Sequence, residues 1–231
     1  MEKIAEGLLW YGLFVLSATV HEAAHATVAY KGGDPTAYHA GQVTLDPLAH
    51  IRRSPFGMVV LPIASVFLLG WPLGFASAPY NPVWAELHPK RAARMALAGP
   101  VANLLLVLAA GLAIRAGIAL GGFAPPESAV YTHMVAARES GIWPALGAVL
   151  SMAFSLNLIL FILNLIPLPP LDGWASLPLF VSDRTARALQ RFAGRGLGWI
   201  GILVAWQIFP YLLRPAFRAA LNLLYPGASF G

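Results

Sequence analysis

The chain has 231 residues, of which 58% are hydrophobic and only 11% are charged. A soluble domain carries about 25% charged residues, so these few polar groups cannot cover the surface of a soluble fold. The net charge of +5 is what Lys and Arg in loops beside anionic lipid headgroups produce, and we therefore expect no nucleic-acid partner. The absence of cysteine excludes disulfides, thiolate metal sites and cysteine nucleophiles.

Long apolar runs recur along the chain, and most are close to the length of about 20 residues that crosses a bilayer. They lie at 4–20, 55–78, 95–120, 143–167 and 197–213. The first run has no small-residue cleavage site, so we expect it to be retained in the mature protein. The polar connections are too short to fold alone. The sequence therefore predicts an all-α polytopic membrane protein, with residues 1–231 forming a single membrane-embedded domain.

The first run carries three polar side chains in the stretch SATVHEAAHA, residues 17–26. His21 and His25 are four residues apart, so a helix presents both imidazoles on one face, where they can bind one zinc ion. Glu22 lies beside them as a candidate general base, which is the arrangement of HExxH in zinc hydrolases. The alternative is a buried polar cluster that only hydrogen-bonds between helices. Ionisable residues inside a span are costly and usually functional, which favours the metal site.

The second run, residues 55–78, is interrupted by Pro62, Gly70, Pro72 and Gly74. Prolines and glycines at this density favour a broken or re-entrant segment over a straight span. Within the irregular stretch 71–83, WPLGFASAPYNPV, we expect an edge strand that could pair with an unwound substrate peptide.

A third zinc ligand is needed, because catalytic zinc sites usually take three protein ligands. Asp172 lies in FILNLIPLPPLDGW, directly after the run 143–167. Pro167, Pro169 and Pro170 break that helix, and irregular backbone at membrane depth is tolerated where it is buried in protein or lines a wet cavity. Asp172 is therefore the candidate third ligand, and the alternative is an ordinary turn aspartate before a glycine.

Most other histidines and aspartates lie in polar connections, where solvated side chains are expected. These residues are His39, His50, His88, His133, Asp34, Asp46 and Asp183.

The two motifs together resemble the site-2 protease family, the intramembrane zinc metalloproteases. The signatures of that family are HExxH on one membrane helix and an NxxP…LDG segment on another, here HEAAH and NLIPLPPLDG. GGDPTAYHAGQVTLDPLAHIRRSP and LAGPVANLLL, residues 97–106, also resemble the small bacterial and archaeal members, the type without a PDZ or CBS domain. The resemblance covers residues 15–175. Many members read LDGG, whereas Trp174 follows Gly173 here, so the packing after the ligand is expected to differ.

The resemblance implies an intramembrane zinc endopeptidase that hydrolyses membrane-spanning substrates through a zinc-activated water and a glutamate general base. The implied ligands of one Zn²⁺ ion per chain are His21, His25 and Asp172. Glu22 is the implied catalytic base. The resemblance also suggests that Asn103 and Asn164 line the site, where they could hydrogen-bond the substrate backbone or the oxyanion. Packing between helices is the alternative for both asparagines. A substrate helix must unwind first, because its carbonyls are hydrogen-bonded internally.

A shared zinc ion requires its ligands to lie at one depth in the membrane, which constrains the topology. If 55–78 crossed fully, the run 143–167 would carry Asp172 to the side opposite His21. Without that crossing the ligands meet on one side. The predicted full spans are then 5–30, 92–119, 143–167 and 196–213.

The distribution of basic residues agrees with this topology. Of the 15 Lys and Arg residues, ten then lie on the side that holds the site and the remaining five on the other. The positive-inside rule places the site towards the cytoplasmic side of a prokaryotic cell membrane. The ten are Lys31, Arg52, Arg53, Lys90, Arg91, Arg94, Arg184, Arg187, Arg191 and Arg195.

Two other functions compete with proteolysis. One is a proteolytically silent relative that binds membrane partners, but a structural zinc does not need a base such as Glu22. The other is a metal or solute transporter with an intramembrane His/Asp site, and the chain lacks the repeated halves that many transporters show. The expected partners are the lipid bilayer and membrane-protein substrates, and the sequence does not indicate an oligomeric state.

Overall fold

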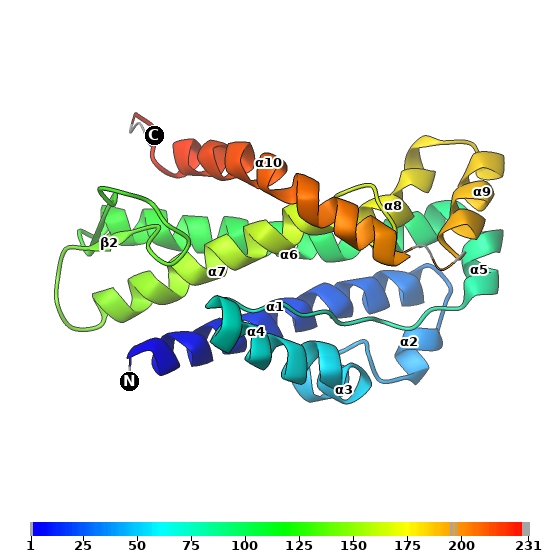
Figure 1. Ribbon diagram of the computed structural model, residues 1–231, viewed down its shortest axis with the longest axis horizontal. Helices are drawn as coiled ribbons and strands as arrows, with labels where there is room; N and C mark the ends of the chain where they lie inside the picture. The colour runs from blue at the N-terminus through cyan, green and yellow to red at the C-terminus, as the bar shows by residue number, and fades with distance from the viewer. Residues whose placement is uncertain (1, 195, 197, 228–231) are drawn as a thin grey trace. The chain divides into compact units, whose positions relative to one another are not determined.

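A computed structural model of the protein describes residues 2–194, 196 and 198–227. One of the ten basic residues named above, Arg195, lies outside the described residues. The described chain is almost entirely helical (Figure 1). Its strands are limited to β1 (Phe123–Ala124) and β2 (Ala136–Ala137), which pair antiparallel. The prediction of an all-α fold is confirmed.

Four described helices are long and apolar enough to cross a bilayer, as predicted. They are α1 (Glu2–Lys31), α6 (Pro89–Ala119), α7 (Trp143–Asn164) and α10 (Gly198–Leu224). Their apolar side chains are widely exposed; on α10, for example, Trp199 is 63% and Leu203 is 58% exposed. Apolar surface of this extent is covered by lipid in a stable protein, so the chain is a multi-pass membrane protein.

Three helix ends differ from the predicted spans. α6 begins at Pro89, because proline is favoured in the first turn of a helix. α7 ends at Asn164, three residues before Pro167. α10 continues past residue 213 to Leu224 with two prolines inside it, which membrane helices tolerate when neighbouring groups satisfy the freed carbonyls.

The segment predicted to be broken or re-entrant is bent. It is built from α3 (Pro47–Arg53), the π-helix η1 (Phe56–Val60) and α4 (Leu61–Leu69), and the axes before and after residues 54–55 differ by 115°. Residues 56–69 form about 21 Å of helix, which is shorter than the hydrocarbon core of a bilayer.

After α4 the chain turns back. Gly70 ends the helix with φ +81°, a left-handed conformation that glycine adopts without strain. The extended chain that follows returns to its start: the N–H of Phe75 donates to the carbonyl of Gly57 at 3.0 Å, and Arg53 Nε donates to the carbonyl of Ser77 at 2.9 Å. The segment is therefore bent back on itself, and the expectation that it enters and leaves on one side of the membrane stays a prediction.

The chain divides into two compact units. Unit 1 consists of Met1–Ala102 and Leu163–Gln207, and unit 2 of Asn103–Ile162 and Ile208–Gly231. Helices α6, α7 and α10 each contribute residues to both. The expectation of a single domain stays a prediction.

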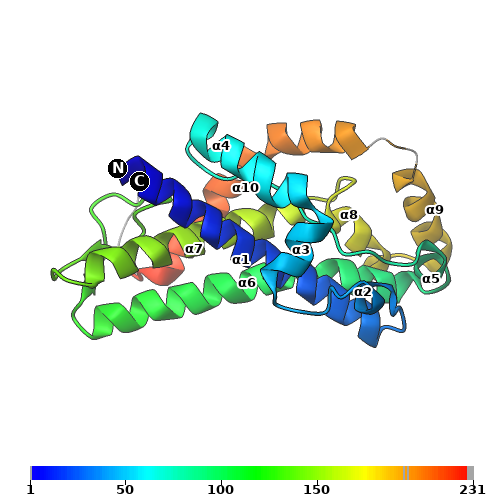
Figure 2. The same cartoon turned by 90° about the horizontal axis from the view of Figure 1, so that it is seen from below.

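Unit 1 is organised around α1, which packs against α3, α4 and the short helix α2 (Thr36–His39). The unit also contains the start of α6 and several short helices, which are α5 (Pro82–Leu87), α8 (Asp172–Ser176), the 3₁₀-helix η2 (Leu177–Phe180) and α9 (Asp183–Ala193). Figures 1 and 2 show α5 and α9 near the C-terminal end of α1, beyond the motif HEAAH.

The end of α1 is fixed by Asp34, which is 1% exposed and not solvated as the sequence suggested. Its Oδ1 accepts from the N–H and the hydroxyl of Thr36, at 3.0 and 2.5 Å, and its Oδ2 accepts from the N–H of Asn81 at 2.7 Å. Nearby, the carbonyl of Gly32 accepts from the indole N–H of Trp84 at 3.2 Å. These bonds tie α1 to the start of α5.

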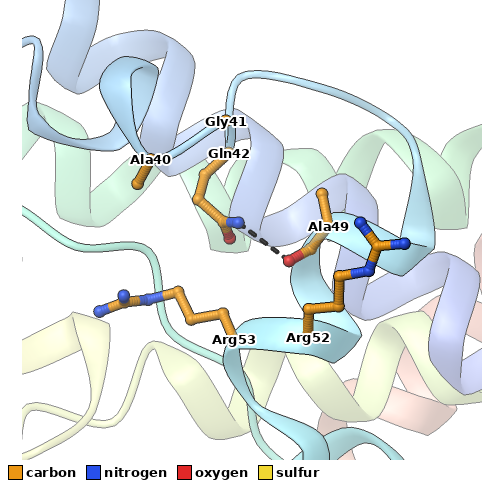
Figure 3. A pocket seen from close by; sticks show the side chains of 6 residues that line it. All are labelled: Ala40, Gly41, Gln42, Ala49, Arg52 and Arg53. Carbon is orange, nitrogen blue, oxygen red and sulfur yellow. Dashed lines mark hydrogen bonds between the residues drawn. The ribbon is translucent and has the colours of Figure 1, made fainter.

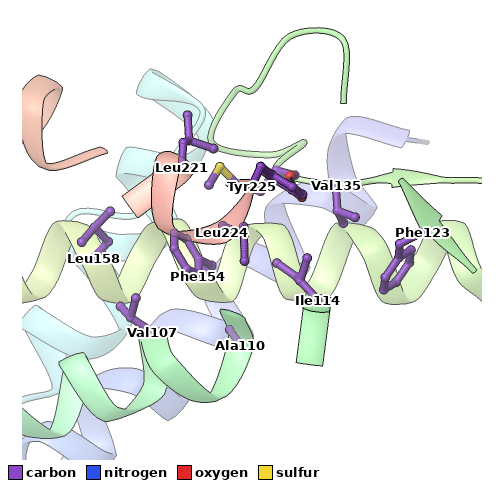
Figure 4. Close-up of a cluster of buried hydrophobic side chains, with 11 residues drawn as sticks. Val107, Ala110, Ile114, Phe123, Val135, Phe154, Leu158, Leu221, Leu224 and Tyr225 are labelled. Carbon is purple, nitrogen blue, oxygen red and sulfur yellow. Dashed lines mark hydrogen bonds between the residues drawn. The ribbon is translucent and has the colours of Figure 1, made fainter. Parts of the chain in front are cut away.

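Unit 2 has its own apolar core, drawn in Figure 4. Side chains from α6, α7 and the end of α10 meet there, among them Ile114, Phe154 and Leu221. Tyr225 donates its hydroxyl to the carbonyl of Met134 at 2.6 Å, which holds the 120–142 connection against this core.

We expect Asp34→Asn to destabilise the protein. The Asn81 N–H would then face an amide NH₂ group, or Thr36 would lose its acceptor, so at least one hydrogen bond to a charged group disappears. Such a loss costs about 1.5–3 kcal/mol. Denaturant unfolding in detergent measures this change. Asp46→Asn is the matched control, because Asn caps α3 as well as the exposed Asp46 does, and we expect a change within about 0.5 kcal/mol.

The difference between wild type and Asp34→Asn should depend on pH. Burial raises the pKa of Asp34, but the hydrogen bonds from Thr36 and Asn81 outweigh it and hold the pKa below its usual value. A lowered pKa means that the stabilisation is complete above about pH 4 and is lost as the pH falls through the pKa of the folded protein. A difference that is constant from pH 7 down to pH 3 would contradict this.

Candidate metal centre

The motif SATVHEAAHA lies within α1, so His21, Glu22 and His25 share one region of a continuous helix. All three are buried. The two Nε2 atoms of the histidines lie 3.0 Å apart, and the rings meet edge to face with centroids at 4.6 Å. The helical spacing of four residues therefore aims both imidazoles at one point.

Asp172 is the first residue of α8, where the chain folds back after α7. Its neighbour Gly173 is needed for this fold: a Cβ there would lie 2.3 Å from the carbonyl oxygen of Leu165 and 2.5 Å from that of Ile166. The interruption of α7 and the missing side chain at 173 together set the direction of the carboxylate.

The structure brings the three predicted ligands together. Oδ2 of Asp172 lies 3.1 Å from Nε2 of His21 and 3.4 Å from Nε2 of His25, although 151 residues separate Asp172 from His21 along the chain. Two atoms that bind the same tetrahedral zinc at about 2.0–2.2 Å are themselves about 3.3–3.5 Å apart. The three donor atoms are thus spaced within a few tenths of an ångström of what one zinc ion needs.

Space for an ion exists because α6 passes the histidines at a glycine. A Cβ at Gly99 would lie 2.4 Å from the Nε2 atoms of both His21 and His25. The space left by this missing side chain adjoins both imidazole nitrogens, which is what a shared ion requires. The donor set, two imidazoles and a carboxylate, also suits zinc. The residues present therefore fit this metal.

Helix α6 also orients His25. Nδ1 of His25 donates to the carbonyl oxygen of Met95 at 2.7 Å, which leaves the lone pair of Nε2 directed at the shared space. The helix comes close enough because its inward face carries small residues, Ala92, Ala96 and Gly99. This role was not predicted from LAGPVANLLL, although the spacing of the small residues along α6 was a signal for it.

Glu22 lies beside the histidines, with a carboxylate oxygen within 4.8 Å of their nitrogens. Its Oε2 is buried and finds no hydrogen-bond partner among the residues that the structure describes. Buried oxygens are nearly always paired, so an unpaired one points to a water or substrate group that completes it.

Asn103 and Asn164 differ in their surroundings. Asn103 is fully buried in unit 2, where its Nδ2 donates to Oδ1 of Asn157 at 2.8 Å and so joins α6 to α7. This bond agrees with the packing alternative. Asn164 is the last residue of α7, is half-buried and belongs to unit 1 with the histidines. A role for either in substrate binding stays a prediction.

Unit 1 also contains an open cavity of about 480 Å³ between α2 and α3 (Figure 3). The predicted site residues are not among its lining residues, which are Ala40, Gly41, Gln42, Ala49, Arg52 and Arg53. Gln42 donates to the carbonyl of Ala49 at 3.0 Å. His50 of α3 is 1% exposed and donates to the carbonyl of Thr44, so the expectation of a solvated side chain was wrong for it. Its role is to close the loop.

Comparison with known proteins agrees with the metal centre. The chain is 31% identical over 205 residues to the Bacillus subtilis protein named "Putative zinc metalloprotease YwhC". The matched region covers 89% of the chain and 84% of that relative. The chain belongs to the site-2 protease family. Two further site-2 protease relatives carry the name "Putative zinc metalloprotease Rip2". Identity is 32% over 193 residues in Mycolicibacterium smegmatis and 31% over 195 residues in Mycobacterium tuberculosis H37Rv.

The chain spans 63% and 65% of the length of these two Rip2 proteins. No family model matches this site-2 protease, and no solved structure matches it.

Gly99→Ala should weaken metal binding in this site-2 protease. The added methyl group would occupy the space beside both imidazole nitrogens, and we expect zinc affinity to fall at least about tenfold, as for other changes around metal ligands. Competition with a chromophoric chelator measures the affinity. Gly12→Ala is the matched control, because a Cβ at this position of α1 meets nothing within 4 Å. Equal zinc affinity in the two variants would refute the role of Gly99.

Proposed function

We propose that this site-2 protease is a zinc endopeptidase that hydrolyses peptide bonds of membrane-spanning substrates. His21, His25 and Asp172 would hold one zinc ion per chain. The observation that carries the proposal is the convergence of three donor atoms within 3.4 Å of one another. They lie beside a buried glutamate on a helix that is long and apolar enough to span a membrane.

Bound zinc supplies a Lewis acid for the scissile carbonyl and lowers the pKa of a water towards about 7. Glu22 then acts as the general base, since its buried and unpartnered Oε2 is free to accept a proton from water. The same carboxyl group would deliver the proton to the leaving amine. Met95 and Gly99 take no part in proton transfer; they fix the direction of His25 and keep the space beside it open.

Substrates must reach the site as unwound chain, because helical carbonyls are already hydrogen-bonded. We propose that the extended chain at residues 71–81 pairs with such a peptide by strand addition. This chain is held from behind by Ser65, whose hydroxyl accepts from the N–H of Leu73 at 2.6 Å, and by Gly57, whose carbonyl accepts from Phe75. Asn164 and Asn103 stay candidates for hydrogen bonds to the substrate.

The proposed location is a prokaryotic cell membrane, with the metal centre towards the cytoplasm. The basic residues on the proposed cytoplasmic side that the structure describes include Arg184, Arg187 and Arg191 of α9, which are all exposed. Exposed Lys and Arg of this kind are retained in the cytoplasm during insertion.

Glu22→Gln should separate catalysis from metal binding. Loss of a general base lowers the rate of hydrolysis by about 10²–10⁴-fold, while the zinc content should stay stoichiometric because Glu22 is not a proposed ligand. The assay uses purified protein, a panel of single-span substrates and metal analysis of the same samples. Glu86→Gln, an exposed substitution on α5, is the control and should change neither quantity.

Each contrary result has a distinct meaning. Cleavage that survives Glu22→Gln would remove the proposed mechanism. Stoichiometric zinc without cleavage of any substrate by the wild-type protein would favour a partner-binding or transport role instead.

Single-cysteine labelling can test the proposed topology, because the chain has no native cysteine. Leu45→Cys before α3 and Glu86→Cys after the extended chain flank the re-entrant segment, and both positions are exposed. We expect both to react only after the cell membrane is made permeable, whereas Glu127→Cys, in the connection between α6 and α7, should react in intact cells. Labelling of the two flanking positions from opposite sides would show that 55–78 crosses fully.

A further inference from the structure

Lys90, the second residue of α6, makes an unusual set of contacts for a residue near a helix N-terminus. Its Nζ donates to the backbone carbonyls of Pro178 at 2.7 Å, Leu179 at 3.3 Å and Val181 at 2.5 Å. A lysine ammonium has three donors, and all three are used. A cation near a helix N-terminus opposes the helix dipole, so these carbonyls must be what makes the position favourable.

The carbonyls belong to the end of the segment that begins with Asp172. Helix α8 starts at Asp172 and runs directly into η2, which ends at Phe180. The last carbonyls of a helical segment have no partners within it, and a lysine side chain can satisfy them. Lys90 therefore caps the C-terminal end of a short helical segment whose N-terminal residue is the proposed zinc ligand.

The same helix, α6, holds the other half of the metal centre. Met95, five residues after Lys90, accepts the hydrogen bond that orients His25, and Gly99 lies against both imidazoles. One continuous helix thus contacts the histidine pair through its second and third turns and the Asp172 segment through its first. The ligands on α1 and on α8 are positioned against a common support.

The Asp172 segment has a second attachment, which leads to α9 and not to α6. Trp174 of α8 donates to the carbonyl of Leu189 of α9 at 3.3 Å. Gln190 of α9 donates to the carbonyl of Ala85 at 3.0 Å, which ties α9 in turn to α5. Lys90 is therefore the residue that links the Asp172 segment directly to α6, the helix that contacts both histidines.

We infer that Lys90 is a positioning residue of the metal centre: by binding the carbonyls at the end of η2, it holds the Asp172 carboxylate at the histidine pair. The inference rests on the proposed function in taking Asp172 as a zinc ligand. The hydrogen bonds of the Lys90 ammonium go to backbone carbonyls and not to the three proposed ligands. Its effect on zinc must therefore pass through Asp172, which makes it separable from a general contribution to folding.

The test is a double-mutant cycle on zinc affinity, measured by chelator competition with the full-length protein in detergent. We expect Lys90→Met to weaken zinc binding by about 10–100-fold, as removal of supporting contacts around metal ligands does. In the Asp172→Asn background the same change should have almost no further effect, because the group that it positions is already lost. Arg94→Met, an exposed substitution one turn further along α6, is the matched control and should leave affinity unchanged.

A second readout reports the geometry of the site directly. Visible absorption of the Co²⁺-loaded protein depends on the number and arrangement of ligands. The spectrum of Lys90→Met should change in the same direction as that of Asp172→Asn, while Arg94→Met keeps the wild-type spectrum. If Lys90→Met does not give a monodisperse, helical protein, Lys90→Gln, which keeps two donors, replaces it in the same cycle.

The outcomes distinguish the two proposals. If wild type binds zinc but Lys90→Met binds it equally well, the inference is wrong and the proposed function stands. Equal losses from Lys90→Met in the two backgrounds would likewise show that Lys90 acts on stability alone. If Asp172→Asn binds zinc as wild type does, Asp172 is not a ligand and the inference fails with it. A wild-type protein that binds no zinc would overturn both proposals.

Discussion

The close approach of α6 to α1 at Gly99 is the constraint on which unit 1 depends. Only a residue without a side chain lets the α6 backbone pass beside two imidazole nitrogens, since a Cβ there would lie 2.4 Å from both. The same approach brings the carbonyl of Met95 within 2.7 Å of His25. Small residues in membrane helices usually serve packing between helices. Here the small residues of α6 have two effects: they allow α6 to pack closely against α1, and they set the geometry of the candidate metal centre.

The irregular segments follow from this arrangement. Asp172 can reach the histidines only if α7 ends early and the chain folds back at Gly173. The run at 55–78 is bent, and the bond between Phe75 and Gly57 holds the extended chain after α4 against the start of the same run. Broken helices at membrane depth leave backbone groups to be satisfied. Ser65 and Lys90 satisfy such groups with side chains, and Asp34 does so at the end of α1.

Many of the helices and the candidate metal ligands could be predicted from sequence, because local sequence patterns indicate them. The spacing of His21 and His25 placed two donors on one helical face, and the prolines after Asn164 marked the end of a helix. The prolines and glycines of 55–78 predicted a break, and the structure shows a bend there, whereas the expectation that this run does not cross fully stays a prediction. The burial of Asp34 and the roles of Met95 and Lys90 were not predicted. Met95 binds the side chain of His25, and Lys90 binds backbone carbonyls at the end of η2. Both partners are distant in sequence, and no local pattern distinguishes Met95 or Lys90 from ordinary helical residues. Asn157, the partner of Asn103, was missed for the same reason.

The chemistry of the donor set has a consequence for metal choice in the cell. Two imidazoles and one carboxylate form a set of borderline hardness that accepts several first-row divalent ions, with affinities that follow the Irving–Williams order. A site with thiolate ligands would favour softer ions, but the chain has no cysteine. Selectivity must therefore come from the narrow space between the imidazoles and Gly99, and from which ions the cell keeps available. Oxidants that inactivate thiolate sites would find no such ligand to attack in this one.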